Sequence, residues 1–63
     1  MNFDIGDLVT YDPAFHPSGV GIVIQINHEY DVDGYFWNTI LVMTPSGGEI
    51  LFDEDEIDAV ESR

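Results

Sequence analysis

The sequence predicts a small all-β protein with five short strands. β-branched and aromatic residues gather in short runs, and glycine or proline separates these runs. In the clearest run, over residues 20–27, apolar residues alternate with a period of two, which is typical of a strand. No periodicity of three to four residues persists over a full helical window, so the pattern argues against a helical fold.

The first half of the chain predicts two strands separated by a long loop. The β-rich run 8–11 stops at Asp12-Pro13, and residues 13–19 hold two prolines and a glycine. A second strand follows over 20–27, and Gly21 within it indicates a bend or a close approach by a neighbouring backbone. The alternation places Val20, Ile22, Ile24 and Ile26 on one face and Gly21, Val23, Gln25 and Asn27 on the other.

The second half predicts a hairpin and three further strands. The polar segment 28–34 is the expected hairpin tip, and residues 35–44 form the third strand, whose pattern does not decide which face Leu41 and Met43 take. A tight turn over 45–48 leads to a strand over 49–52. A single 3₁₀ turn over 53–56 precedes the last strand, 57–60, and residues 61–63 are expected to fray.

The charge balance restricts the classes of partner. The chain has 63 residues, 13 acidic residues, one basic residue and a formal net charge of −12. Direct nucleic-acid binding is not expected, because the single basic residue, Arg63, cannot neutralise the phosphates. Cationic protein surfaces are favoured instead. Because a domain of this length buries little surface and the chain has no cysteine, self-association into a homo-oligomer is a further expectation.

The sequence further predicts a single folded domain over 1–63 in the cytoplasm. An apolar fraction of 44% argues against disorder. The first residues lack the basic and apolar regions of a secretion signal, and no apolar run approaches the ~20 residues needed to span a bilayer. Anionic lipid would also repel the chain, so no membrane role is expected.

The order of these elements resembles the small SH3-like barrel, including its KOW and Tudor relatives. Gly6-Asp7-Leu8-Val9 and Gly19-Val20-Gly21-Ile22-Val23 are similar to the openings of the first two strands of such barrels, and 53–60 resembles their closing segment. The resemblance implies a five-stranded barrel over almost the whole chain. The RNA-binding role of KOW barrels does not transfer, because their basic residues are absent here. Polyproline binding does not transfer either, since Tyr11 alone cannot form that groove.

Size and acidity also make the chain similar to small uncharacterised proteins of tailed bacteriophages. That resemblance implies an accessory protein in the host cytoplasm. Its anionic face would dock on a basic host or viral protein and could occupy a nucleic-acid site as a mimic or inhibitor. The alternative is a self-associating structural subunit whose acidity serves only solubility.

Nine residues are the candidates for a partner-binding face. Five lie in the acidic run at the end of the chain, two in the hairpin tip, and two aromatic residues would supply the desolvated anchor. A charge block of this kind is also typical of a solvated connector that blunts an edge strand. The candidates are Asp53, Glu54, Asp55, Glu56, Asp58, Asp31, Asp33, Tyr35 and Trp37.

Two other interpretations apply to the hairpin. Asp31-Val32-Asp33-Gly34 begins like a calcium loop, but Tyr35 and Val42 occupy later ligand positions, so a hairpin turn with Gly34 at positive φ is favoured. Tyr30 and Tyr35 flank the acidic tip, as an aromatic cage for a methylated ammonium would require. Most aromatic residues are nevertheless expected in the core, with at least one ring of 35–37 facing outward as a contact patch.

The sequence predicts no enzyme, no cofactor and no metal. His16 and His28 lie in predicted loops without a nucleophile motif, and no phosphate-binding glycine loop precedes a helix. A barrel of this size is also expected to lack a concave pocket of ~300 Å³ or more.

Overall fold

The computed structural model describes residues 3–60, which form five antiparallel strands in one sheet and contain no α-helix. The strand order is β4-β3-β2-β1-β5, so the last strand returns to lie beside the first. The predicted all-β class is confirmed. The strands are β1 (Leu8–Tyr11), β2 (Val20–Tyr30), β3 (Phe36–Met43), β4 (Glu49–Asp53) and β5 (Ile57–Ala59), with the 3₁₀ helix η1 (Glu54–Glu56) before β5.

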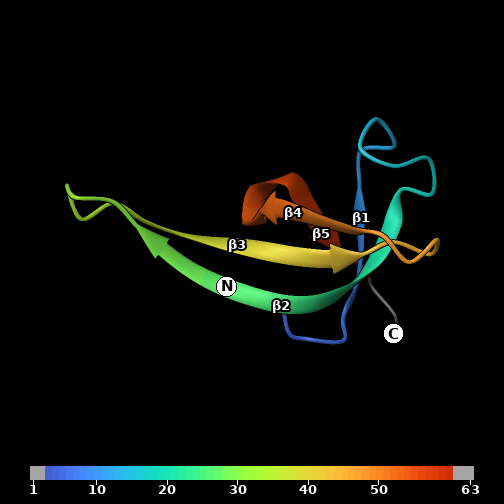
Figure 1. Cartoon of the computed structure of the whole chain (residues 1–63), viewed down its shortest axis with the longest axis horizontal. Helices are drawn as coiled ribbons and strands as arrows, with labels where there is room; N and C mark the ends of the chain where they lie inside the picture. The colour runs from blue at the N-terminus through green and yellow to red at the C-terminus, as the bar shows by residue number, and fades with distance from the viewer. Residues whose placement is uncertain (1–2, 61–63) are drawn as a thin grey trace.

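The element bounds differ from the predicted ones mainly at the hairpin. β2 continues to Tyr30, three residues further than predicted, because His28, Glu29 and Tyr30 pair with the beginning of β3. Figure 1 shows that the end of this hairpin projects beyond the other strands. The predicted fraying of 61–63 lies outside the described residues. No helix among the described residues has the length and apolar character needed to cross a membrane.

A β-bulge in β2 overturns the predicted alternation. The pairing with β3 shifts between Val23, which faces Val42, and Gln25, which faces Leu41, so Ile24 is an extra residue. Past the bulge, Ile26 pairs with Ile40 and packs against the core, whereas Ile22 is 40% exposed on the opposite face. Ile22 and Ile26 therefore do not share a face. A pattern of apolar residues cannot reveal an inserted residue when the insert is itself apolar.

The core lies on one side of a strongly curved sheet. Seven side chains form it: Val9, Tyr11, Val23, Ile40, Val42, Phe52 and Ile57. Tyr11 of β1 and Phe52 of β4 are separated by two strands in the sheet order, yet their ring centroids are 4.9 Å apart. The sheet therefore wraps around its own inner face, although β4 and β5 are edge strands that do not pair with each other in the described part of the chain.

The core contains fewer aromatic side chains than predicted. Tyr11 and Phe52 are buried, whereas Phe15, Tyr30, Tyr35 and Phe36 are each at least half exposed. Aliphatic residues on the central strands fill most of the interior. The rings near the hairpin therefore remain at the surface.

The long loop between β1 and β2 is held against the body of the sheet. The Tyr11 hydroxyl donates to the carbonyl oxygen of Val20 at 2.7 Å. His16 lies between the hydroxyls of Ser18 and Ser46, at 2.8 and 3.2 Å from its two ring nitrogens. These contacts join the loop to the turn between β3 and β4.

Candidate partner-binding site

The candidate site is formed where β3 extends beyond the end of β4. Asp53, the last residue of β4, pairs with Thr39, so β3 residues 36–38 have no partner on that side. The chain then leaves the sheet through η1 instead of continuing along β3. The hairpin end and the β4–η1 corner consequently face each other across a gap.

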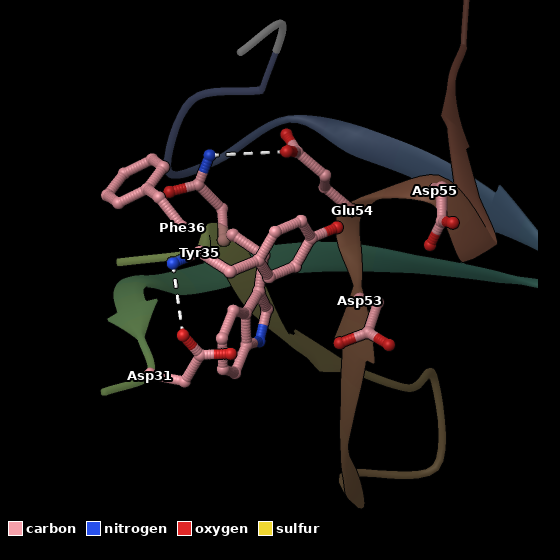
Figure 2. Close-up of a pocket in the computed structure, with 8 residues that line it drawn as sticks. Asp31, Tyr35, Phe36, Asp53, Glu54 and Asp55 are labelled. Atoms are coloured by element: carbon pink, nitrogen blue, oxygen red, sulfur yellow. Dashed lines mark hydrogen bonds between the residues drawn. The ribbon is translucent and has the colours of Figure 1, made fainter. Parts of the chain in front are cut away.

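An open cavity of about 470 Å³ occupies this gap. The expectation that so small a domain lacks a pocket of this size is wrong, because the cavity lies outside the core, between two projecting segments. Figure 2 shows Asp31 from the hairpin loop on one side and Asp53, Glu54 and Asp55 on the other. The lining residues are Asp31, Tyr35, Phe36, Trp37, Asn38, Asp53, Glu54 and Asp55.

Aromatic rings form one wall of the cavity. Tyr35 and Trp37 stack with their centroids 5.7 Å apart and an interplanar angle of 30°. Phe36 points to the other side of the strand and stacks on His28, at 5.9 Å. Tyr35 is 67% exposed, so a ligand entering the cavity would meet an accessible ring. Tyr30, the other ring considered for a cage, does not line the cavity.

Asp31 connects the hairpin turn to the cavity. One of its carboxylate oxygens accepts hydrogen bonds from the backbone N–H groups of Asp33 and Tyr35, at 2.9 and 3.0 Å. Gly34 closes the turn with φ +83°, as predicted. Within residues 3–60, no three histidine or acidic side chains converge as a metal-ligand set. The observed role of Asp31 is thus to shape the loop that carries Tyr35.

Asn38 is a lining residue that the sequence did not single out. It is buried, and its amide oxygen accepts a hydrogen bond from His28 Nδ1 at 2.6 Å. Its amide nitrogen is 3.4 Å from Glu54 Oε1, so Asn38 links the hairpin to η1. One feature of the sequence could have identified Asn38: it lies among β-branched and aromatic residues of a predicted strand. Asparagine is disfavoured at such a position unless its amide group has hydrogen-bond partners.

The structure brings six of the nine predicted site residues together around the cavity. The other three lie elsewhere. Asp33 is in the hairpin turn, Glu56 accepts a hydrogen bond from the backbone N–H of Asp53 at 2.8 Å, and Asp58 lies on β5, where it pairs with Thr10 of β1. The acidic run is therefore divided: Asp53, Glu54 and Asp55 line the cavity, whereas β5 carries Asp58 away from it.

The electrostatic character of the cavity is strongly negative. Four carboxylates border it, and residues 3–60 contain no lysine or arginine that could neutralise them. Carboxylates beside accessible ring faces favour a cation, because the ring quadrupole and the carboxylate charge attract the same ligand. The arrangement can bind an ammonium or a guanidinium group.

Comparison of the chain with protein families, curated proteins and solved structures finds no match.

Proposed function

We propose that the protein is a non-enzymatic binding module that docks on a basic protein surface and receives a lysine or arginine side chain in its cavity. The observation that carries this proposal is the convergence of four carboxylates and a stacked Tyr35–Trp37 pair around one open cavity. A cation in this position would contact ring faces and carboxylates at the same time.

The expected strength of one such contact is modest. A cation over an exposed ring contributes ~0.5–1 kcal/mol, and an exposed ion pair contributes ~0.2–1 kcal/mol. Several contacts on one partner are therefore needed for stable binding, with the surrounding charge mainly accelerating association. This fits a module that recognises an extended basic surface.

The same chemistry supports competition with nucleic acid. A surface that binds phosphates presents lysine and arginine, which are the side chains that this cavity favours. We propose that the partner's cationic surface is one that otherwise contacts nucleic acid, and that the protein acts as an accessory factor of the kind found in tailed bacteriophages.

We also propose that the curved sheet belongs to the SH3-like barrel class. The support is the strand order, in which β1 lies between β2 and β5, and the 3₁₀ helix immediately before the last strand. The contact between Tyr11 and Phe52 is further support, because it requires a sheet as strongly curved as that of a small barrel.

The chain contains an internal reporter for the cation test. Trp37 is the only tryptophan, and it lines the cavity. Its fluorescence can be followed during titration with short peptides that differ only in one central residue: arginine, lysine, trimethyllysine or glutamine. We expect a saturable change with the cationic peptides, no change with glutamine, and affinity that falls when NaCl rises from about 50 to about 300 mM.

Two double variants with equal charge provide the matched comparison. D53N/D55N removes two carboxylates from the cavity, whereas D12N/D33N removes two that lie in loops outside it. The first should weaken cation binding about tenfold, corresponding to ~1.4 kcal/mol, and the second less than about threefold. Equal losses for both variants, or equal binding of the glutamine peptide, would contradict the proposal.

A further inference from the structure

The face of the sheet opposite the core carries a band of exposed apolar side chains, which we term the outer band. In the strand register, Leu8 of β1 faces Ile22 of β2, and Ile22 faces Met43 of β3. In the next row, Leu41 of β3 faces Leu51 of β4. Residues directly opposite each other on neighbouring strands project to the same side. The outer band therefore spans four strands in two adjacent rows, which Met43 and Leu41 connect on β3.

The outer band is accessible to a partner. Leu8, Ile22 and Met43 are 40–44% exposed, and Leu51 is 56% exposed. Isolated apolar residues at a surface are ordinary, but a contiguous apolar patch bordered by polar groups is typical of a protein interaction site. The opposite side chains of the same strands, including Val9, Val23 and Val42, already form the core. The outer band is not required to complete the interior.

Carboxylates border the outer band. Glu49 faces Met43 in the register, and Asp58 faces Thr10, which is two residues from Leu8. Asp53 is two residues from Leu51 on the same side of β4, about 7 Å along the strand, and it also lines the cavity. The outer band consequently adjoins the candidate site through Asp53, and the three carboxylates at its border carry the same sign of charge.

This border argues against a second copy as the occupant. The chain has one basic residue in total, so a second copy could not neutralise the carboxylates around the outer band. Bringing two chains of charge −12 together would also add long-range repulsion. A partner that supplies both apolar side chains and flanking cations satisfies both parts of the surface.

We propose that the outer band is a second docking surface, which binds an amphipathic basic segment of a partner protein. The apolar stripe of that segment packs on Leu8, Ile22, Met43 and Leu51, while its lysine or arginine residues face the bordering carboxylates. This inference rests on the proposed function for the sign of the partner's charge. The apolar part of the contact, however, is made by the outer band and not by the aromatic residues of the cavity.

The test uses three helical probe peptides of about 14 residues each. The first has leucine on one face and lysine on the other, the second replaces leucine with glutamine, and the third replaces lysine with glutamate. Binding is measured by calorimetry on the full chain. We expect the leucine–lysine peptide to bind about tenfold or more tightly than the glutamine–lysine peptide, because only the former covers apolar area.

Threonine replacements test the band itself while retaining strand propensity. M43T/L51T and, independently, L8T/I22T should reduce affinity for the leucine–lysine peptide about tenfold and leave the glutamine–lysine peptide unaffected. V32T is the control, because Val32 is fully exposed in the hairpin loop, away from the outer band. Thermal unfolding of each variant verifies that it is folded.

The outcomes separate this inference from the proposed function. A D53N/D55N variant that no longer binds the glutamine–lysine peptide, and still binds the leucine–lysine peptide more tightly, would show that the outer band acts independently of the cavity. Unchanged peptide affinities in both band variants would overturn the inference. So would equal binding of the leucine–glutamate peptide, or a wild-type dimer in sedimentation experiments that the band variants abolish.

Discussion

At the scale of single residues, Gly21 is a position inside a strand where close packing, and not a turn, requires glycine. Its neighbour across the sheet is Val9, and both belong to the inner side of the sheet. A Cβ atom at residue 21 would lie 2.7 Å from the carbonyl oxygen of Met43 and would overlap the side chain of Val42. The predicted close approach of a backbone at Gly21 is confirmed. The absence of a side chain lets β3 pack directly against β2 at this point.

Gly21→Ala should therefore destabilise the fold. The clash involves backbone and a fully buried valine, neither of which can move freely, so we expect a loss of ~1–3 kcal/mol. For a domain of this size, this lowers the melting temperature by at least ~5 °C. Gly48→Ala is the milder comparison, since Gly48 has no positive φ and an added Cβ would require only Thr44 Oγ1, 3.3 Å away, to move by a few tenths of an ångström. Equal melting temperatures for the two variants would exclude the packing explanation.

At the scale of elements, the β2–β3 hairpin consists of two parts with different supports. Its inner part contributes Val23, Ile40 and Val42 to the core. Its outer part, from His28 to Asn38, is held by strand pairing, by the stack of His28 on Phe36 and by the Asp31 turn. Segments with few buried apolar contacts open at lower free energy than the core does. This outer part carries the aromatic wall of the candidate site.

Hydrogen exchange should resolve the two parts. We expect backbone amides in 29–36 to exchange at least about tenfold faster than those of Val23, Ile40 and Val42, a difference of ~1.4 kcal/mol or more in local opening. Gly34→Ala should accelerate exchange in the hairpin end further, because φ +83° costs an alanine ~1–2 kcal/mol. Protection in the core should change less. Uniform protection along β2 and β3 would show that the hairpin opens as one unit.

At the scale of the whole molecule, uncompensated negative charge opposes the compact state. Residues 3–60 include no lysine or arginine, and the two histidines hydrogen-bond to serine and asparagine side chains, not to carboxylates. Folding brings the carboxylates closer together than they are in the extended chain. Screening by salt reduces this repulsion over a Debye length of ~8 Å at physiological ionic strength.

We therefore expect the protein to become more stable as NaCl increases. Between about 20 and about 500 mM NaCl, the melting temperature should rise by ~4 °C or more, which corresponds to ~0.5–1 kcal/mol for a domain of this size. D33N/D58N, which carries two fewer charges, should show a smaller rise. Calorimetry provides the measurement. A melting temperature that stays constant or falls with salt would mean that charge repulsion does not contribute to stability.

Partner binding should respond to salt in the opposite direction. The same ions that screen repulsion within the fold also screen attraction between Asp53 or Glu54 and a cationic partner. A single salt series thus distinguishes the two effects of the charge: stability increases while affinity decreases. The proposed function requires only the decrease in affinity, whereas the increase in stability tests charge repulsion within the fold.

The sequence by itself determined the class of the fold and the position of most of its elements. Runs of β-branched and aromatic residues next to glycine or proline identified the first four strands, and the fifth was identified as the apolar run after the acidic segment, because these preferences act locally. The extreme charge also led to the expectation of a cationic partner, which stays a prediction. The predicted hairpin turn at Asp31, with Gly34 at positive φ, is confirmed by the backbone geometry and by the hydrogen bonds that Asp31 accepts.

Only the tertiary structure decided which residues share a surface. Because of the bulge at Ile24, the residues of β2 that follow it project to the face opposite the one that simple alternation predicts. The register between β3 and β4 places Trp37 and Asp53 beside one cavity. The outer band likewise appears only when the pairing of β1 to β4 is known. Strand propensity is a property of neighbouring residues, whereas register and curvature arise from contacts between residues distant in sequence, which a one-dimensional pattern does not contain.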